Sequence, residues 1–318
     1  MPRGGAKMRR DAFTRRGVIA GLAALAAVPA RAFAEESVPW SAGTEKPTLA
    51  APPNTADCHH HIYDSRFPVA ANAVLRPADA TVAMYRLLQQ RLGTTRHVIV
   101  QPSTYGVDNR CLLDALMQFG QATARGVAVV NTEVTDAELK QLHAAGVRGI
   151  RFNLAPPGAT TFAMVEPLAR RVQPLGWHIQ VHAPGAVIVE HAALWESQPC
   201  EVVFDHMARI RPELGVHDPV FALASRLLQK GKAWVKLSGA YLNSKVGPPT
   251  YADCTVVAQA YVKEAPERLV WGSDWPHPTE KVKPDDAILF DLLAQWVPDE
   301  ATRTRILVDN PGRLYGFG

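Results

Sequence analysis

Two histidines separated by one residue, His59 and His61, lie in the sequence DCHHHIYD at residues 57–64. Side chains alternate between the two faces of a β-strand, so we expect His59 and His61 on one face, with Cys58 and the middle histidine on the other. Two neutral imidazoles directed into one cavity can hold a divalent metal or polarise a carbonyl group. Many surface His-x-His pairs do nothing, so this prediction depends on polar groups at other strand ends.

Two further apolar runs end in residues that could take part in catalysis. Residues 202–206 end in His206, and residues 269–274 end in Asp274. Strand alternation predicts that His206 lies on the face of Phe204, opposite Asp205. A carboxylate beside histidines can accept a proton from water or bind a metal that activates water. The structural alternatives are a core histidine at position 206 and a helix cap or ion pair at position 274.

A fifth strand end adds a possible metal ligand, His182, after residues 178–181. Convergence of three histidines and one aspartate would form an open site for one divalent metal, zinc or manganese, with nitrogen–zinc distances of about 2.0–2.1 Å. The predicted ligands are His59, His61, His182 and Asp274. Asn153 ends the fourth run, where a carboxylate-bridged pair of metals would need Lys or Glu. We therefore expect one divalent metal or none.

Three basic residues lie within the apolar runs. Arg148 and Arg151 are three apart, so on a strand they face opposite sides. Arg151 is in phase with Asn153 and is expected to bind a substrate carboxylate or carbonyl through charge-assisted hydrogen bonds. The alternative to substrate binding for Arg148 is a salt bridge on the helix-facing side of the strand. Lys236, in phase with Ser238, could pair with a carboxylate of the barrel or contact substrate, and the sequence leaves both open.

Eight apolar runs alternate with helical patterns such as residues 109–123 and 136–145. This alternation predicts an α/β fold, a parallel (β/α)8 TIM barrel. After the first run, the expected strands are residues 96–101, 126–130, 147–153, 177–182, 201–206, 233–238 and 268–274. Active sites of such barrels lie at the carboxyl ends of the strands, where this sequence places His61, Ser103, Asn153, His182, His206, Ser238 and Asp274. An open doubly wound sheet is the alternative, but no Gly-x-Gly-x-x-Gly turn follows the first run.

The first 34 residues have the order of an export leader. Arg15 and Arg16 precede a short apolar run, and the sequence Ala32-Phe33-Ala34 offers a cleavage site after Ala34. The apolar run is too short to cross about 30 Å of hydrocarbon, which argues against an uncleaved anchor and a stable membrane span. We predict twin-arginine export to the periplasm, an arm at residues 35–55 and a barrel at residues 56–318.

Net charge gives little sign of a macromolecular partner. The chain has 34 basic and 30 acidic residues, of which the leader holds seven and one. The remainder carries 27 basic and 29 acidic residues, a net charge of −2. With no basic stripe, we expect no nucleic-acid partner. The four cysteines share no metal-like spacing.

Together these motifs resemble the amidohydrolase superfamily, in its amidohydrolase-related branch of pyrone-dicarboxylate lactonases, sugar lactonases and galactarolactone isomerases. The resemblance covers the chain from about residue 53 to the C-terminus. It depends on residues 57–61, 98–103, 106, 108–109, 146–153, 204–207, 270–277 and 309–311.

The resemblance implies a barrel of the metal-dependent hydrolase type whose hydrolase activity opens a lactone. Asp274 would activate water against a ring carbonyl that the histidines polarise, and the implied catalytic residues are His59, His61, His206 and Asp274. Substrate, a carboxylated pyrone or sugar-acid lactone, would be bound by Ser103, Arg148 and Arg151, with His182 and Lys236 as further candidates. The sequence predicts no oligomeric state.

Two departures bear on these expectations. The pyrone lactonases carry a tyrosine where His182 stands and work without metal, so the histidine reopens the question of a metal. The arginine expected after the seventh strand is absent from residues 238–243, which weakens the case for a dicarboxylate.

Three other functions stay open. The C-terminal third resembles the isomerases, in which an asparagine replaces the aspartate of the eighth strand. Asp274 therefore favours hydrolysis over lactone migration, because water attack needs a base. The remaining alternatives are a metal-dependent decarboxylase and a sugar-acid binding protein without turnover.

Overall fold

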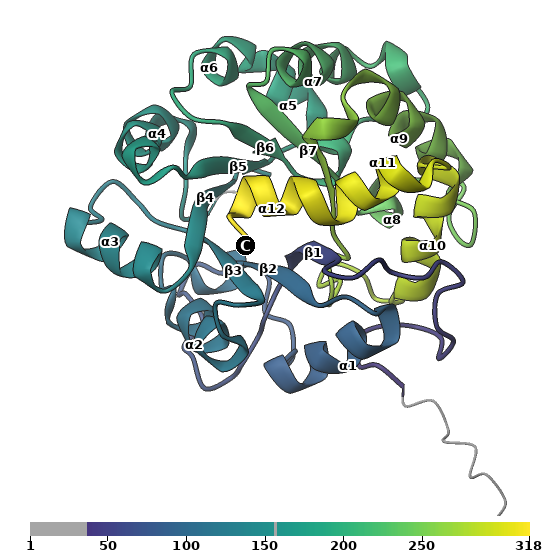
Figure 1. Ribbon diagram of the computed structural model, residues 1–318. Helices are drawn as coiled ribbons and strands as arrows, with labels where there is room; N and C mark the ends of the chain where they lie inside the picture. The colour runs from purple at the N-terminus through teal and green to yellow at the C-terminus, as the bar shows by residue number, and fades with distance from the viewer. Residues whose placement is uncertain (1–36, 156–157) are drawn as a thin grey trace, which may run out of the picture. The chain divides into compact units, whose positions relative to one another are not determined.

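Eight parallel strands form one sheet in the order β1 to β8 in this computed structural model, which describes residues 37–155 and 158–318 (Figure 1). The strands are β1 (Ala56–His60), β2 (Arg96–Val100), β3 (Ala124–Ala128), β4 (Val147–Asn153), β5 (His178–His182), β6 (Val202–Phe204), β7 (Ala233–Leu237) and β8 (Leu269–Trp271). The predicted (β/α)8 barrel is confirmed. The predicted leader lies outside the described residues.

The sheet closes just beyond the ends of β1 and β8. The backbone nitrogen of Asp274 donates to the carbonyl of His59 at 2.7 Å, and that of His61 donates to the carbonyl of Trp275 at 2.8 Å. These two bonds join the first and last strands at the end where the polar residues gather.

Helices surround the sheet: α1 (Val82–Leu92), α2 (Arg110–Phe119), α3 (Asp136–Ala144), α4 (Val165–Val172), α5 (Gly185–Glu190), α6 (Ala192–Glu196), α7 (Pro219–Gln229), α8 (Ala240–Asn243), α9 (Ala252–Glu264), α10 (Asp286–Trp296), α11 (Glu300–Thr304) and α12 (Asn310–Tyr315). The helix predicted to reach residue 123 ends at Phe119, because Gly120 has a φ of 83° that stops it. Among the described residues, no helix is long and apolar enough to cross a bilayer.

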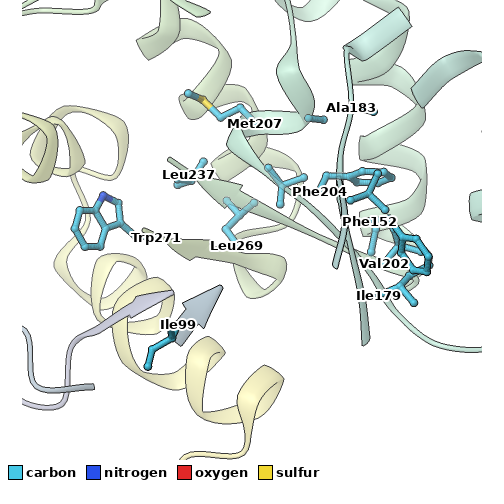
Figure 2. Close-up of a cluster of buried hydrophobic side chains, with 14 of the residues drawn as sticks. Ile99, Phe152, Ile179, Ala183, Val202, Phe204, Met207, Leu237, Leu269 and Trp271 are labelled. Atoms are coloured by element: carbon cyan, nitrogen blue, oxygen red, sulfur yellow. The ribbon is translucent and has the colours of Figure 1, made fainter. Parts of the chain in front are cut away.

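Two apolar layers hold the barrel together. Outward-facing strand residues such as Phe152, Ile179 and Phe204 pack beneath the helices (Figure 2). A second cluster lies inside the barrel, where Val98, Val127, Val203 and Val270 meet side chains of the C-terminal segment. Burial of a large apolar side chain contributes about 1.5–3 kcal/mol, so both layers add to stability.

The C-terminal segment closes the end of the barrel where the strands begin. Helix α12 lies across this end, with the C-terminus near the barrel centre (Figure 1). Arg125 of β3 donates to the carbonyl oxygens of Tyr315 at 3.1 Å and Gly316 at 2.6 Å. Leu314, Tyr315 and Phe317 complete the interior cluster.

A bulge in β1 changes which side chains face inward. Asp57 pairs with His97 whereas His60 pairs with Ile99, so β1 holds one extra residue between these pairs. His59 and His61 share a face, as predicted, but Cys58 also joins the interior cluster. The predicted opposition of Cys58 and His59 is therefore wrong, because strict alternation fails across a bulge.

Candidate active site

A cavity of about 470 Å³ opens at the carboxyl ends of the strands. It is lined by His61, Tyr63, Leu75, Pro102, Ser103, Arg151, Asn153, His182, His206, Arg209, Tyr241, Leu242, Asp274, Pro278, Thr279 and Glu280. Six predicted site residues are among them: His61, Ser103, Arg151, His182, His206 and Asp274. His59 is fully buried just behind them.

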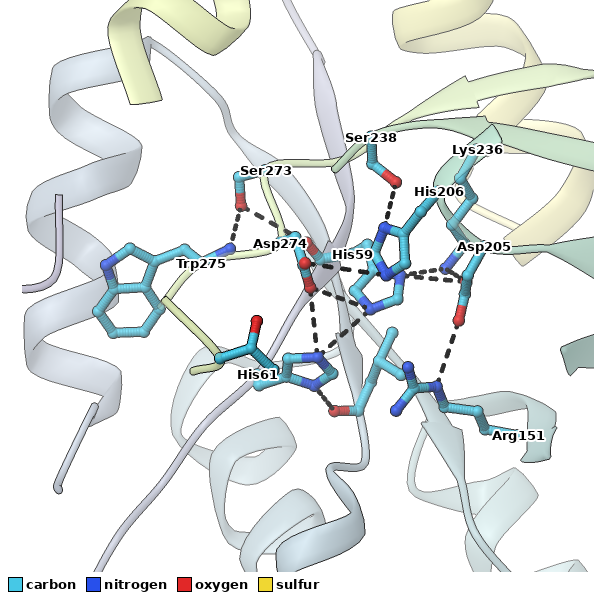
Figure 3. A network of polar contacts seen from close by, with 12 residues as sticks. His59, His61, Arg151, Asp205, His206, Lys236, Ser238, Ser273, Asp274 and Trp275 are labelled. Carbon is cyan, nitrogen blue, oxygen red and sulfur yellow. Dashed lines mark hydrogen bonds and ion pairs between the residues drawn. The ribbon is translucent and has the colours of Figure 1, made fainter. Parts of the chain in front are cut away.

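Three ligand-type atoms form a compact triangle in the cavity floor (Figure 3). His59 Nε2 lies 3.3 Å from His61 Nε2 and 3.5 Å from Asp274 Oδ1, and His61 Nε2 lies 3.4 Å from the same oxygen. The bulge in β1 and the closure of β8 against β1 bring these atoms together. We call this group the histidine–aspartate face.

His61 and His206 are each oriented through the Nδ1 atom of the ring. His61 Nδ1 lies 2.7 Å from the carbonyl of Val100, which can only accept, so the Nε2 of neutral His61 presents a lone pair to the face. His206 Nδ1 lies 2.9 Å from Ser238 Oγ. Such partners fix the orientation and tautomer of an imidazole before substrate arrives.

Asp274 is held in an unusual backbone conformation. Its φ of 65° is rare for a residue other than glycine, and strain of this kind is common at functional sites. Tyr241 Oη donates to Oδ2 at 2.6 Å, and His206 Nε2 lies 3.8 Å from the same oxygen. Next to it, Ser273 donates through N and Oγ to the buried carboxylate of Asp57, which anchors this loop to β1.

A left-handed turn places both Asp205 and His206 in the barrel interior. Residues 206–209 have φ values of 52°, 55°, 57° and 52°. Strand alternation predicted opposite faces for Asp205 and His206, but β6 ends at Phe204 and the turn brings His206 back toward His59, with ring centroids 4.8 Å apart. That prediction is wrong because His206 is not part of the strand.

Burial controls the charge of the site. It lowers the pKa of His206 to about 4, against the opposing charge of Asp274. Burial also lowers the pKa of His59 and of His182 well below the ordinary value. For Asp274, burial alone would raise the pKa, but the surrounding histidines, His206 foremost, hold it well below its usual range. At neutral pH the site thus holds the ionised carboxylate of Asp274 beside the neutral imidazoles of His59, His182 and His206.

The donor set matches a single divalent metal in residue types and spacing, provided that each imidazole turns a lone pair to the ion. Ligands of a tetrahedral zinc ion about 2.0–2.2 Å from the metal lie roughly 3.4 Å apart, as the three atoms of the face do. His206 is the fourth donor within reach, since its ligand atom lies within 4.8 Å of those of His59 and Asp274. The ligand atom of His182 lies close to those of His206 and Asp205 instead. The predicted ligand set was therefore wrong to include His182.

Positive charge lines one wall of the cavity. Arg151 donates from Nε to Asp205 Oδ2 at 3.3 Å, and its side chain also borders the cavity beside Ser103. Arg209 reaches the cavity from the left-handed turn, and its buried Nη1 has no hydrogen-bond partner within residues 37–155 and 158–318. These guanidinium groups suit an anionic ligand.

Sequence reasoning missed Asp205, Arg209 and Tyr241 as site residues. Asp205 and Arg209 flank His206 in the sequence, and this closeness was the available signal. Tyr241 lies in the short helix α8 after β7, within the segment where the expected arginine is absent, and donates to Asp274 from there.

Two basic residues predicted to bind substrate lie elsewhere. Arg148 is near the start of β4, where its Nη1 donates to the carbonyls of His143 at 3.0 Å and Val147 at 2.7 Å. Lys236 is fully buried beneath the cavity, with Nζ 3.6 Å from Asp205 Oδ1. The substrate-binding prediction for Arg148 is wrong, because Arg148 is at the opposite end of the barrel. Of the two alternatives for Lys236, the structure shows the pairing with a carboxylate of the barrel.

Comparison with known proteins gives consistent matches over most of the chain. A family model described as amidohydrolase matches residues 56–317. A 2-pyrone-4,6-dicarboxylate hydrolase of Comamonas testosteroni is 36% identical over 289 residues, covering 87% of this chain and 94% of that protein. The D-galactarolactone isomerase of Agrobacterium fabrum is 31% identical over 274 residues, covering 85% and 93%.

A solved structure agrees with these matches. The crystal structure of a probable 2-pyrone-4,6-dicarboxylic acid hydrolase of Acinetobacter baumannii, with citric acid bound, has a TM-score of 0.72 and 31% identity. The match covers 83% of this chain and 100% of that chain.

Proposed function

This chain belongs to the amidohydrolase family, and from this premise we propose that it is a hydrolase that opens a lactone carrying a carboxylate. One observation carries the proposal: the Asp274 carboxylate lies 3.4–3.8 Å from the Nε2 atoms of His61, His59 and His206, beneath a wall that bears Arg151 and Arg209. A base, polarising groups and an anion-binding wall thus share one cavity.

Asp274 is the proposed base. It accepts a proton as water attacks the ring carbonyl carbon, and His206, which is held through Nδ1 by Ser238, polarises the carbonyl through an Nε2–H group. Its low pKa keeps it ionised at neutral pH, and Tyr241 fixes its orientation. Collapse of the tetrahedral intermediate breaks the ring C–O bond, and the proton passes to the departing ring oxygen.

Substrate orientation is assigned to the basic wall. Arg151 and Arg209 present guanidinium groups that can hold a carboxylate by paired hydrogen bonds, and Ser103 adds a hydroxyl. This contact would place the lactone carbonyl over the histidine–aspartate face. The proposal agrees with the dicarboxylate named for the Comamonas relative.

A divalent metal, where one is bound, would be held by His59, His61, His206 and Asp274 and would supply Lewis-acid polarisation of the carbonyl. The steps above are derived from the side chains alone.

Lactone isomerisation is the second candidate, because the isomerase relative shares most of this chain. Migration of a lactone within a sugar diacid can use an internal hydroxyl as the nucleophile. An ionised carboxylate placed to deprotonate water favours hydrolysis.

Substitution of Asp274 by asparagine tests the base. A positioned general base contributes about 10²–10⁴-fold, so we expect Asp274→Asn to lower kcat for hydrolysis at least about a hundredfold. The amide keeps the shape of the side chain, so KM should change little. Hydrolysis of 2-pyrone-4,6-dicarboxylate and of sugar-diacid lactones, followed by proton release, measures both parameters.

Asp291→Asn is the matched control, because Asp291 lies on α10 and accepts backbone hydrogen bonds from residues 48 and 49. Unchanged hydrolysis in the Asp274 variant would move the role of base to His206. Loss of hydrolysis with retained lactone migration would separate the two candidate activities.

A further inference from the structure

A buried ammonium group lies directly behind the histidine–aspartate face. Lys236 on β7 has no exposed surface, and its Nζ donates to the carbonyl of Cys58 at 2.8 Å and to Gln180 Oε1 at 2.8 Å. The same nitrogen lies 3.2 Å from His59 Nδ1. Figure 3 shows Lys236 and Asp205 on the side of His59 away from Asp274.

Lys236 and Asp205 compete for one ring nitrogen. Asp205 Oδ1 also lies 3.2 Å from His59 Nδ1, but among the described residues this oxygen has no hydrogen-bond partner of suitable geometry. An ammonium can only donate and a carboxylate can only accept. If Lys236 donates to Nδ1, the proton of neutral His59 is on Nε2.

The position of that proton decides what the face can bind. With the proton on Nε2, His59 can donate to His61 Nε2 at 3.3 Å, with Asp274 Oδ1 3.5 Å from the same nitrogen, so this corner of the triangle offers a proton and not a lone pair. With the proton on Nδ1, three lone pairs converge and attract a cation. The residues around His59 thus decide whether the histidine–aspartate face carries a proton or three lone pairs.

Charge acts in the same direction as the tautomer. Lys236 lies 3.6 Å from Asp205 Oδ1 on the inner side of His59, and Arg151 and Arg209 border the cavity, which the carboxylates of Asp274 and Glu280 also line. A doubly charged ion bound to His59 Nε2 would be separated from the ammonium by little more than one imidazole ring. At an effective dielectric constant of about 20, repulsion over such a distance weakens binding by at least about a hundredfold.

We propose that Lys236 holds His59 in its Nε2–H tautomer and keeps divalent cations out of the histidine–aspartate face. The face then presents a proton to Asp274, and the guanidinium groups of Arg151 and Arg209 line the cavity wall where an anionic ligand would bind. Lys236 acts through His59, so it is a positioning residue. The inference goes beyond the proposed lactone hydrolysis and holds whichever lactone is the substrate.

Zinc affinity of charge-removing variants tests this proposal. Lys236→Met preserves side-chain length, and Lys236→Gln keeps an amide donor for the carbonyl of Cys58. Each metal-free protein is titrated with zinc against a chromophoric chelator, and cobalt absorption spectra report tetrahedral binding. Lys232→Met is the matched control, because Lys232 precedes the same strand but lies at its opposite end, near the carbonyl of Gln198.

We expect both Lys236 variants to bind one zinc ion at least about a hundredfold more tightly than the unaltered protein, and Lys232→Met to bind it equally. Folded Lys236 variants with unchanged zinc affinity would overturn the proposal. Nitrogen-15 NMR of the unaltered protein gives a second test that needs no variant at position 236. A His59 resonance with the proton on Nδ1 would contradict the assigned tautomer, and one with the proton on Nε2 supports it.

Discussion

The two ends of the barrel differ in backbone strain and in the polarity of their buried side chains. At the carboxyl end, residues 206–209, Asp274 and His277 all have positive φ values, and buried charges crowd around His59. At the amino end, Leu314, Tyr315 and Phe317 pack on valines of the strands. Residues other than glycine in such conformations cost about 1–3 kcal/mol each, so the first end stores strain while the second contributes stability.

This difference predicts that substitutions at the two ends fail in different ways. Changes at the carboxyl end should alter catalysis or relieve strain, whereas changes at the amino end should alter the free energy of unfolding and leave kinetic constants of the folded enzyme unchanged. Four comparisons test this separation.

Tyr315→Ala should have the largest effect on stability. Its buried ring packs against His178 and Phe317, and truncating a large buried aromatic residue costs about 3–5 kcal/mol. Chemical denaturation measures the loss. Tyr315→Phe should stay within about 1 kcal/mol, because the hydroxyl has no hydrogen-bond partner in the described part of the chain. A reduced kcat in the folded Tyr315→Ala enzyme would contradict the prediction that the amino end affects stability alone.

Arg151 and Arg148 form a matched pair from one strand. Hydrogen bonds to a charged group contribute about 1.5–3 kcal/mol, so Arg151→Gln should raise KM for a carboxylated lactone tenfold or more. Arg148→Gln should leave KM and kcat unchanged, because Arg148 only contacts backbone carbonyls near the start of β4. Equal changes of KM in both variants would show that Arg148 also contributes to substrate binding.

His178 makes the amino-end interior sensitive to acid. Burial lowers its pKa from 6.5 to about 3, so between these values the unfolded chain binds a proton that the folded chain does not. Stability from this group is complete above pH 6.5 and falls by about 1.4 kcal/mol per unit as the pH drops toward 3. His178→Leu should therefore flatten the loss of stability in acid. Parallel curves for both proteins would contradict this role.

Ala208→Gly should have the smallest effect and an unusual sign. Ala208 has a φ of 57°, a conformation that glycine adopts freely, so the substitution should stabilise the fold by about 0.5–1 kcal/mol. Ala258→Gly is the control, since Ala258 is equally buried within α9 and should lose about 1 kcal/mol. Destabilisation of similar size in both variants would show that the turn is not strained.

Prediction from sequence was most successful where the signal is local. Alternating apolar runs and helical patterns located all eight strands to within a few residues, because strand and helix periods are read along the chain. The positions of His61, Ser103, His206 and Asp274 followed from the rule that barrel sites lie at strand ends.

Failures occurred where one residue alters the register or where position along a strand matters. The bulge in β1 turns Cys58 inward, and the left-handed turn after Phe204 admits Asp205 and His206 together. Arg148 and Arg151 are about 10 Å apart along β4 at 3.3 Å per residue, so they serve opposite ends of the barrel. Alternation gives the face of a residue but not its depth.

The sequence by itself determined the barrel, the order of its strands and the residue types at their carboxyl ends, since these follow from periodicity and composition along the chain. Only the tertiary structure decided which atoms meet. Lys236 lies 177 residues from His59 in the sequence yet 3.2 Å from its ring nitrogen, because closure of the barrel brings distant strands around a common interior. The tautomer and charge of a buried imidazole depend on such neighbours, which no local pattern specifies.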